Sequence, residues 1–206
     1  RSTAQATPQL GDLGVKQSMS VKASNGESLE GKDLRAIQLA TYTAASVDGN
    51  TIVGYDLTTN TALASDITAA AKAAGATDTN LTVNGKNDPM VWVVKNLTDS
   101  RSDPWSGKLR NFCNSLAKQT NFAKQDGTAV STLSQDKATM STGNVLVPGI
   151  YAIVDRTPAT TTLSSGTAIK TTASIMMMNG TAVNGVNQLR TAGGTTLTLG
   201  QVIYKV

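Results

Sequence analysis

The chain lacks the side chains that carry most enzymatic chemistry. Its 206 residues include no histidine, so no histidine general base and no Cys–His or Ser–His pair can form. The only glutamates, Glu27 and Glu30, lie in a Gly-flanked segment typical of an exposed turn, where both carboxylates stay ordinary. The single cysteine, Cys113, stands between Phe112 and Leu116 in a helical pattern, which favours a small buried residue over a reactive thiol. We therefore expect no enzyme activity.

Metal and cofactor sites are not predicted either. One cysteine and no histidine exclude the common zinc sites, and the acidic residues do not have EF-hand spacing. We interpret Gly193-Gly194 as a hairpin turn, because no Gly-rich phosphate loop follows a strand and opens a helix there.

The charge pattern argues against nucleic acid as a partner. The net charge is +4, but the lysines are scattered singly and aromatic residues make up only 4% of the chain. Nucleic-acid binding needs basic residues clustered on one face, with aromatics for stacking. No stretch approaches the ~20 apolar residues of a membrane span. We expect this chain to contact neither nucleic acid nor membrane.

Hydrophobic periodicity predicts strands, then helices, then strands. Alternation predicts early strands, and the turn signals Asn25-Gly26 and Asp48-Gly49-Asn50 follow the first and second of them. Asp88-Pro89 and Asp103-Pro104 are helix starts, with the aspartate as N-cap and the proline first in the helix. The expected strands are 15–23, 34–42, 51–57, 129–133, 150–154, 168–178 and 197–206, and the expected helices are 63–74, 89–97 and 104–116. For 89–97 the spacing predicts a helix, whereas the Val-rich content favours a strand.

This order predicts a mainly β fold: an antiparallel Ig-like β-sandwich with a few α-helices inserted in a long central connection. We expect residues 1–12 to be a flexible leader. Residues 13–206 should form a single domain, with the helical insertion at about 60–120.

Four segments together resemble one protein family. They are Leu29–Tyr42, Asp88–Leu97, the Val-Pro-Gly-Ile-Tyr-Ala-Ile-Val run of Val147–Val154, and Thr198–Val206. Their order is similar to the N-terminal domain of Gram-positive backbone (shaft) pilins polymerised by sortase, of the actinobacterial and bifidobacterial fimbrial type. The resemblance implies an extracellular, cell-wall-attached fimbrium, with neighbouring pilin subunits and a class C sortase as partners. It also implies further pilin domains that this chain does not include.

In that family a lysine at the end of the first domain accepts the next subunit in an intersubunit isopeptide bond. The corresponding residue here is Lys205, after Tyr204, although the proline of the family's Tyr-Pro-Lys motif is missing. The alternative is that Lys205 is an ordinary solvated strand lysine.

Many such domains also contain an internal Lys–Asn isopeptide bond assisted by an acid. Lys16 or Lys22 could supply the amine and Asp155 the acid, while Asn184 and Asn187 precede the last expected strand. Because the last strand has no asparagine, we expect no internal bond.

A second function is compatible with the sequence. An adhesive domain would bind a host glycan, mucin or matrix protein through Thr- and Asn-rich loops and through Trp92 or Trp105, if either is exposed. We expect both tryptophans to lie in the core.

Overall fold

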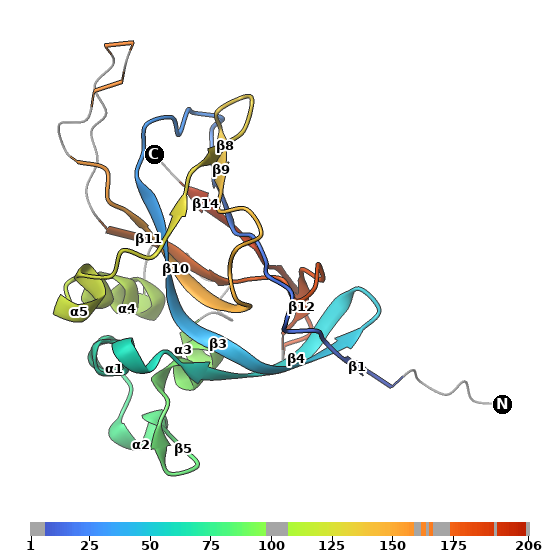
Figure 1. Cartoon of the computed structure of the whole chain (residues 1–206). Helices are drawn as coiled ribbons and strands as arrows, with labels where there is room; N and C mark the ends of the chain where they lie inside the picture. Colours follow the sequence, from blue (N-terminus) through green and yellow to red (C-terminus); the bar gives the residue numbers. More distant parts are fainter. Residues whose placement is uncertain are drawn as a thin grey trace.

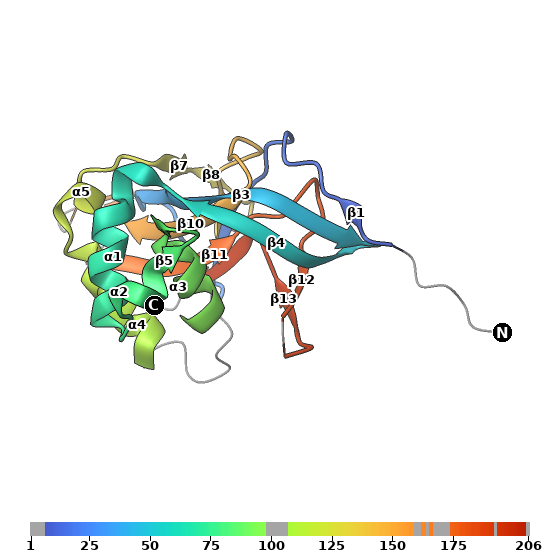
Figure 2. The same ribbon diagram turned by 90° about the horizontal axis from the view of Figure 1, so that it is seen from below.

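A layer of helices, a large sheet and a small sheet are packed on one another (Figures 1 and 2). The computed structural model describes residues 7–97, 107–158, 162–163, 165–166, 174–191 and 193–204. Strands make up 39% and helices 24%, so the expectation of a mainly β fold is confirmed.

The large sheet is built around the long strand β3. β3 pairs antiparallel with β10 on one side and with β4 on the other, and β1 and β7 pair with its two ends. The strands are β11 (Ser174–Gly180), β10 (Gly149–Asp155), β3 (Leu34–Asp48), β4 (Thr51–Thr59), β12 (Gln188–Arg190) and β13 (Thr196–Thr198) in spatial order, with β1 (Gln9–Leu10) and β7 (Thr128–Val130) beside β3.

The small sheet covers one face of the large one. Its strands in spatial order are β14 (Gln201–Tyr204), β2 (Ser20–Ala23), β9 (Thr139–Ser141) and β8 (Thr132–Leu133). Val21 of β2 and Val202 of β14 share one buried cluster with Ala36 of β3 and Ile153 of β10. This cluster is the core between the two sheets.

The helices cover the opposite face of the large sheet and lie in the chain between β4 and β7. Ile67 of α1, Met90 of α3 and Phe112 of α4 join Ala152 of β10 in a second buried cluster. The helical elements are η1 (Thr61–Leu63), α1 (Ala64–Ala73), α2 (Asp78–Leu81), α3 (Pro89–Leu97), α4 (Gly107–Ala117) and α5 (Thr120–Ala123), with the hairpin β5 (Thr82–Val83) and β6 (Lys86–Asn87) between α2 and α3.

Strand β10 is buried along its whole length because both its faces are covered. Ala152 faces the helices, whereas Tyr151 and Ile153 face the small sheet. β3 changes phase where its register with β10 shifts, so that Leu39 and Ala40 both join the helical cluster.

The start of β10 also depends on close backbone contact. A Cβ on Gly149 would lie 2.1 Å from the carbonyl oxygen of Ala40, so only glycine allows β3 and β10 to approach this closely.

The expectation of a purely antiparallel sandwich is wrong, because two pairings are parallel. β14 pairs parallel with β2, and β12 pairs parallel with β4. Both pairs join segments far apart in sequence, and long connections permit parallel pairing where a short hairpin cannot.

Two expected strands are each divided between the sheets. The segment 129–133 contributes β7 to the large sheet and β8 to the small sheet. The segment 197–206 likewise contains the end of β13 and all of β14, with Gly200 at a φ of 85° between them. Local alternation does not reveal such corners, because it does not show which sheet each half of the segment joins.

Helix α3 begins at the expected proline, but its cap differs. Asp88 does not cap it; the side chain accepts hydrogen bonds from the backbone N–H and the hydroxyl of Thr59. The Thr59 hydroxyl oxygen in turn accepts the Met90 N–H at 3.0 Å. A threonine from β4 therefore satisfies this helix start, which sequence spacing could not indicate.

Candidate functional site

The predicted acceptor Lys205 lies outside the described residues, directly after the last described position, Tyr204. Tyr204 ends β14, an edge strand of the small sheet. The Tyr204 carbonyl accepts the Ser24 N–H at 2.9 Å, so the end of β14 is held beside β2.

A buried lysine lies under this end of β14. Lys32, in the loop before β3, places its Nζ 3.5 Å from Oδ2 of Asp155 at the end of β10. The Lys32 side chain is 8% exposed and that of Asp155 is 2% exposed. Lys32 Nζ also lies 5.1 Å from the centroid of the Tyr204 ring, a cation–π contact. One side chain thus connects the loop before β3, β10 and the last strand.

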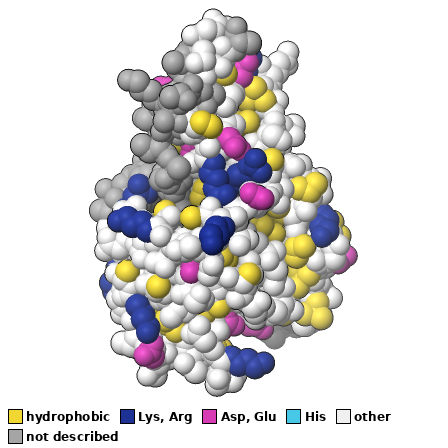
Figure 3. Space-filling view, turned by 60° about the vertical axis from the view of Figure 1, so that its left-hand side comes forward, with side chains coloured by type: hydrophobic (Ala, Val, Ile, Leu, Met, Phe, Trp, Pro, Cys, Tyr) yellow, Lys and Arg dark blue, Asp and Glu magenta, His cyan; other side chains and the backbone are white. Residues whose placement is uncertain are grey.

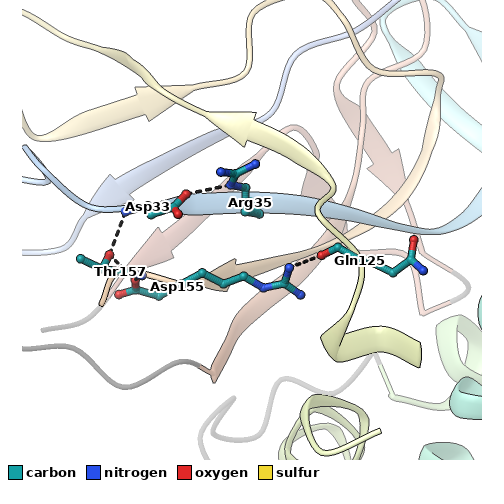
Figure 4. A network of polar contacts seen from close by, with 6 residues as sticks. Asp33, Arg35, Gln125, Asp155 and Thr157 are labelled. Carbon is teal, nitrogen blue, oxygen red and sulfur yellow. Dashed lines mark hydrogen bonds and ion pairs between the residues drawn. The ribbon is translucent and has the colours of Figure 1, made fainter. Parts of the chain in front are cut away.

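Hydrogen bonds fix the Asp155 carboxylate in place (Figure 4). Its Oδ1 accepts the N–H of Thr157 at 2.9 Å and the Thr157 hydroxyl at 2.5 Å. The Thr157 hydroxyl oxygen accepts the backbone N–H of Asp33 at 2.8 Å. Removing the lysine alone would leave a buried carboxylate without this cation, which costs about 3–5 kcal/mol in such pairs.

Two arginines form polar contacts next to this pair. Arg35 pairs with Asp33 through a 2.7 Å contact between Nε and Oδ1. The Arg156 guanidinium donates to the carbonyl oxygen of Gln125 (Figure 4) and to that of Phe122. These bonds join the residue after β10 to α5 and to the segment that follows α5.

The lysines and asparagines that the sequence offered for an internal Lys–Asn isopeptide bond are not buried in the fold. Lys16 and Lys22 are exposed, and so are Asn184 and Asn187. The amine beside Asp155 belongs to Lys32 instead. Lys32 carried no signal of its own in the sequence, since its burial depends on β10 and β14 arriving from distant parts of the chain.

The other buried groups have structural roles. Asp66 of α1 accepts the backbone N–H of Phe122 at 2.7 Å, at the start of α5. Cys113 is buried as expected, and burial raises the pKa of its thiol to about 11. Within the described ranges, no three His, Cys, Asp or Glu side chains are grouped to hold a metal ion.

Surface charges are intermixed on the face of the molecule drawn in Figure 3. Lys and Arg side chains alternate with Asp and Glu among uncharged polar groups, without a broad basic area. Trp92 is half-buried and packs against the helical core, while Trp105 lies outside the described residues.

Comparisons with protein-family models, with curated proteins and with solved structures gave no match. Among the described helices, none combines the length and apolar character needed to cross a membrane.

Proposed function

We propose that this chain is a structural domain of a cell-surface pilus shaft, joined to its neighbours by a class C sortase with Lys205 as the acceptor. In this proposal the domain acts outside the cell in a cell-wall-attached fimbrium. Its partners are neighbouring pilin subunits and the sortase.

The observation that carries the proposal is the parallel pairing of an early strand with the last one. β2 and β14 pair from Ser20 with Gln201 to Ala23 with Tyr204. β14, which directly precedes Lys205, is thus held along its whole length against an early strand of the domain. The proposed acceptor therefore follows a fixed edge of the fold.

The position of the acceptor also supports the proposal. An amine that attacks a sortase acyl intermediate must reach a second protein. Lys205 follows an edge strand whose outer side has no strand neighbour among the described residues. The buried Lys32 beneath Tyr204 would anchor the strand that leads to the acceptor.

We further propose that the two packed sheets are an Ig-like sandwich modified by parallel terminal strands. Their shared buried cluster, with alternating inward-facing residues from both sheets, supports that assignment. The adhesive alternative gains no support from Trp92, which packs against the core.

The test is polymerisation in cells that express the full-length protein and its sortase. Lys205→Arg keeps the positive charge but removes the nucleophilic amine, so the high-mass ladder on a denaturing gel should disappear. Lys22→Arg is the matched control, because Lys22 is an exposed lysine on β2 opposite Ile203. A ladder that survives Lys205→Arg would overturn the assignment of the acceptor.

A further inference from the structure

A groove of about 860 Å³ lies beside β4, far along the large sheet from the end of β14. Residues of helix α3 line one side of the groove, and residues of the β12–β13 hairpin line the other. Apolar side chains line both walls, namely Val91 and Val94 on α3 and Leu189 and Leu197 on the hairpin.

The floor of the groove is the edge of a strand. Five consecutive residues of β4, Val53 to Leu57, line it. Successive strand residues point to opposite faces of a sheet, so a groove that contacts all five runs along the main chain itself. A Cβ built on Gly54 would have no atom within 4 Å, which shows open space beside this main chain.

That edge has no strand partner in the described structure. β12 pairs with only Thr51 and Ile52 and then diverges from β4. From Val53 to Leu57 the strand paired with β4 among the described residues is β3, on the other side. Outward-facing N–H and C=O groups of such an edge are a template for an added strand.

The rim is basic. Lys86, Lys95 and Arg190 are exposed, and none forms an ion pair with another described residue. Of the two acids, Asp88 is hydrogen-bonded to Thr59, which leaves Asp56 as the exposed carboxylate. The charge of this rim complements a ligand that carries carboxylates.

Tyr55 adds a donor within the groove. Its hydroxyl has no hydrogen-bond partner among the described residues, and its ring packs 5.0 Å from that of Tyr42. Burial raises the pKa of Tyr55 to about 12, so the phenol stays protonated and can donate a hydrogen bond to a ligand.

We propose that this groove binds an extended peptide segment of another polypeptide by strand addition along Val53–Leu57. The apolar side chains of the peptide lie against α3 and the β12–β13 hairpin, and its carboxylates face Lys86, Lys95 and Arg190. This binding is separate from polymerisation at Lys205, so the failure of either proposal leaves the other standing.

The experiment is an NMR titration of the whole chain with synthetic peptides. The probe is acetyl-Thr-Val-Glu-Val-Glu-Val-Thr-amide, compared with the same peptide carrying lysine in place of glutamate. We expect the acidic peptide to shift the backbone amides of Val53–Leu57 and to bind at least about fivefold more tightly than the basic one, since its carboxylates are attracted to the exposed basic rim. An acidic peptide N-methylated at alternate residues should lose binding, because it cannot complete the main-chain hydrogen bonds.

Variants locate the site. Leu197→Ser should weaken binding, because Leu197 lines the groove. Ile203→Ser is the matched control and should not weaken it, because Ile203 is a similarly exposed apolar residue on β14 that does not line the groove. The double variant Lys86→Glu, Lys95→Glu should reverse the preference between the two peptides. Absence of amide shifts in β4 at millimolar peptide would overturn the proposal. Equal binding of both peptides, or of the N-methylated one, would overturn it too.

Discussion

At the scale of single residues, the buried pair of Lys32 and Asp155 is the most consequential polar contact near the end of β14. The pair is held by geometry that the sequence did not indicate, and its two members come from segments more than a hundred residues apart. Its contribution to stability follows from burial, because removing one partner of a buried ion pair costs more free energy than removing one partner of a surface pair.

We predict that Lys32→Met lowers the free energy of unfolding by about 3 kcal/mol, because it removes the Lys32 cation from beside the buried Asp155 carboxylate. Lys22→Met, which alters an exposed lysine, should change it by less than about 0.5 kcal/mol. Urea unfolding measures both. Adding Asp155→Asn to Lys32→Met should recover part of the loss, since it removes the buried negative charge. Equal effects of the two lysine variants would show that the pair does not stabilise the fold.

The intact mass gives a second readout for this pair. We expect the mass calculated from the sequence. A deficit of about 17 or 18 Da would instead reveal an internal amide, formed with loss of ammonia from an amide or of water from a carboxyl.

Cys113 gives a pH-dependent prediction. Burial raises the pKa of its thiol from 9.0 to about 11. Between these values the unfolded chain loses this proton while the folded chain keeps it, so the folded state binds more protons and stability falls as pH rises. The loss from this group between pH 8 and pH 10 should be about 1 kcal/mol. In Cys113→Ala, the free energy of unfolding measured in urea should fall by correspondingly less between pH 8 and pH 10 than in the unmodified protein. An identical fall in both proteins would contradict the raised pKa of the Cys113 thiol.

At the scale of elements, helix α3 depends on a residue of another element. The Thr59 hydroxyl accepts the Met90 N–H and donates to Asp88, so β4 and the start of α3 are joined through one side chain. Since α3 is also a wall of the groove, this contact sets the distance between that wall and the edge of β4.

We predict that Thr59→Val destabilises the chain by about 1–3 kcal/mol, because it keeps the shape of the side chain but leaves the Met90 N–H and Asp88 without this partner. Thr58→Val is the matched control, since Thr58 is the exposed neighbour on the same strand. Thermal or urea unfolding distinguishes them. If both variants unfold alike, the capping role is wrong.

At the scale of the whole molecule, the pairing of β2 with β14 joins an early part of the chain to a late part. In Figure 1, β1 lies at one end of the molecule, and β14 ends well away from it. A pull between the chain ends therefore acts on the β1–β3 pair and on the β2–β14 pair.

Single-molecule stretching from the two chain ends tests this arrangement. Ser24→Pro removes the N–H that donates to the Tyr204 carbonyl at 2.9 Å, so the unfolding force should fall. Thr191→Pro removes a comparable bond, from the Thr191 N–H to the Thr195 carbonyl at 2.8 Å, in the β12–β13 hairpin. It should reduce equilibrium stability without a matching fall in force. If the two variants reduce the force equally, β2 and β14 do not form the mechanical clamp.

The amino-acid sequence by itself determined the local features of this protein. Alternation located strands such as 34–42, and Pro89 marked the start of a helix. Each of these depends on residues that are close in the chain. Only the tertiary structure decided that β14 pairs parallel with β2, that Thr59 caps α3 and that Lys32 is buried against Asp155. Those contacts join segments far apart in sequence, and their energy depends on burial and register, which no local pattern contains.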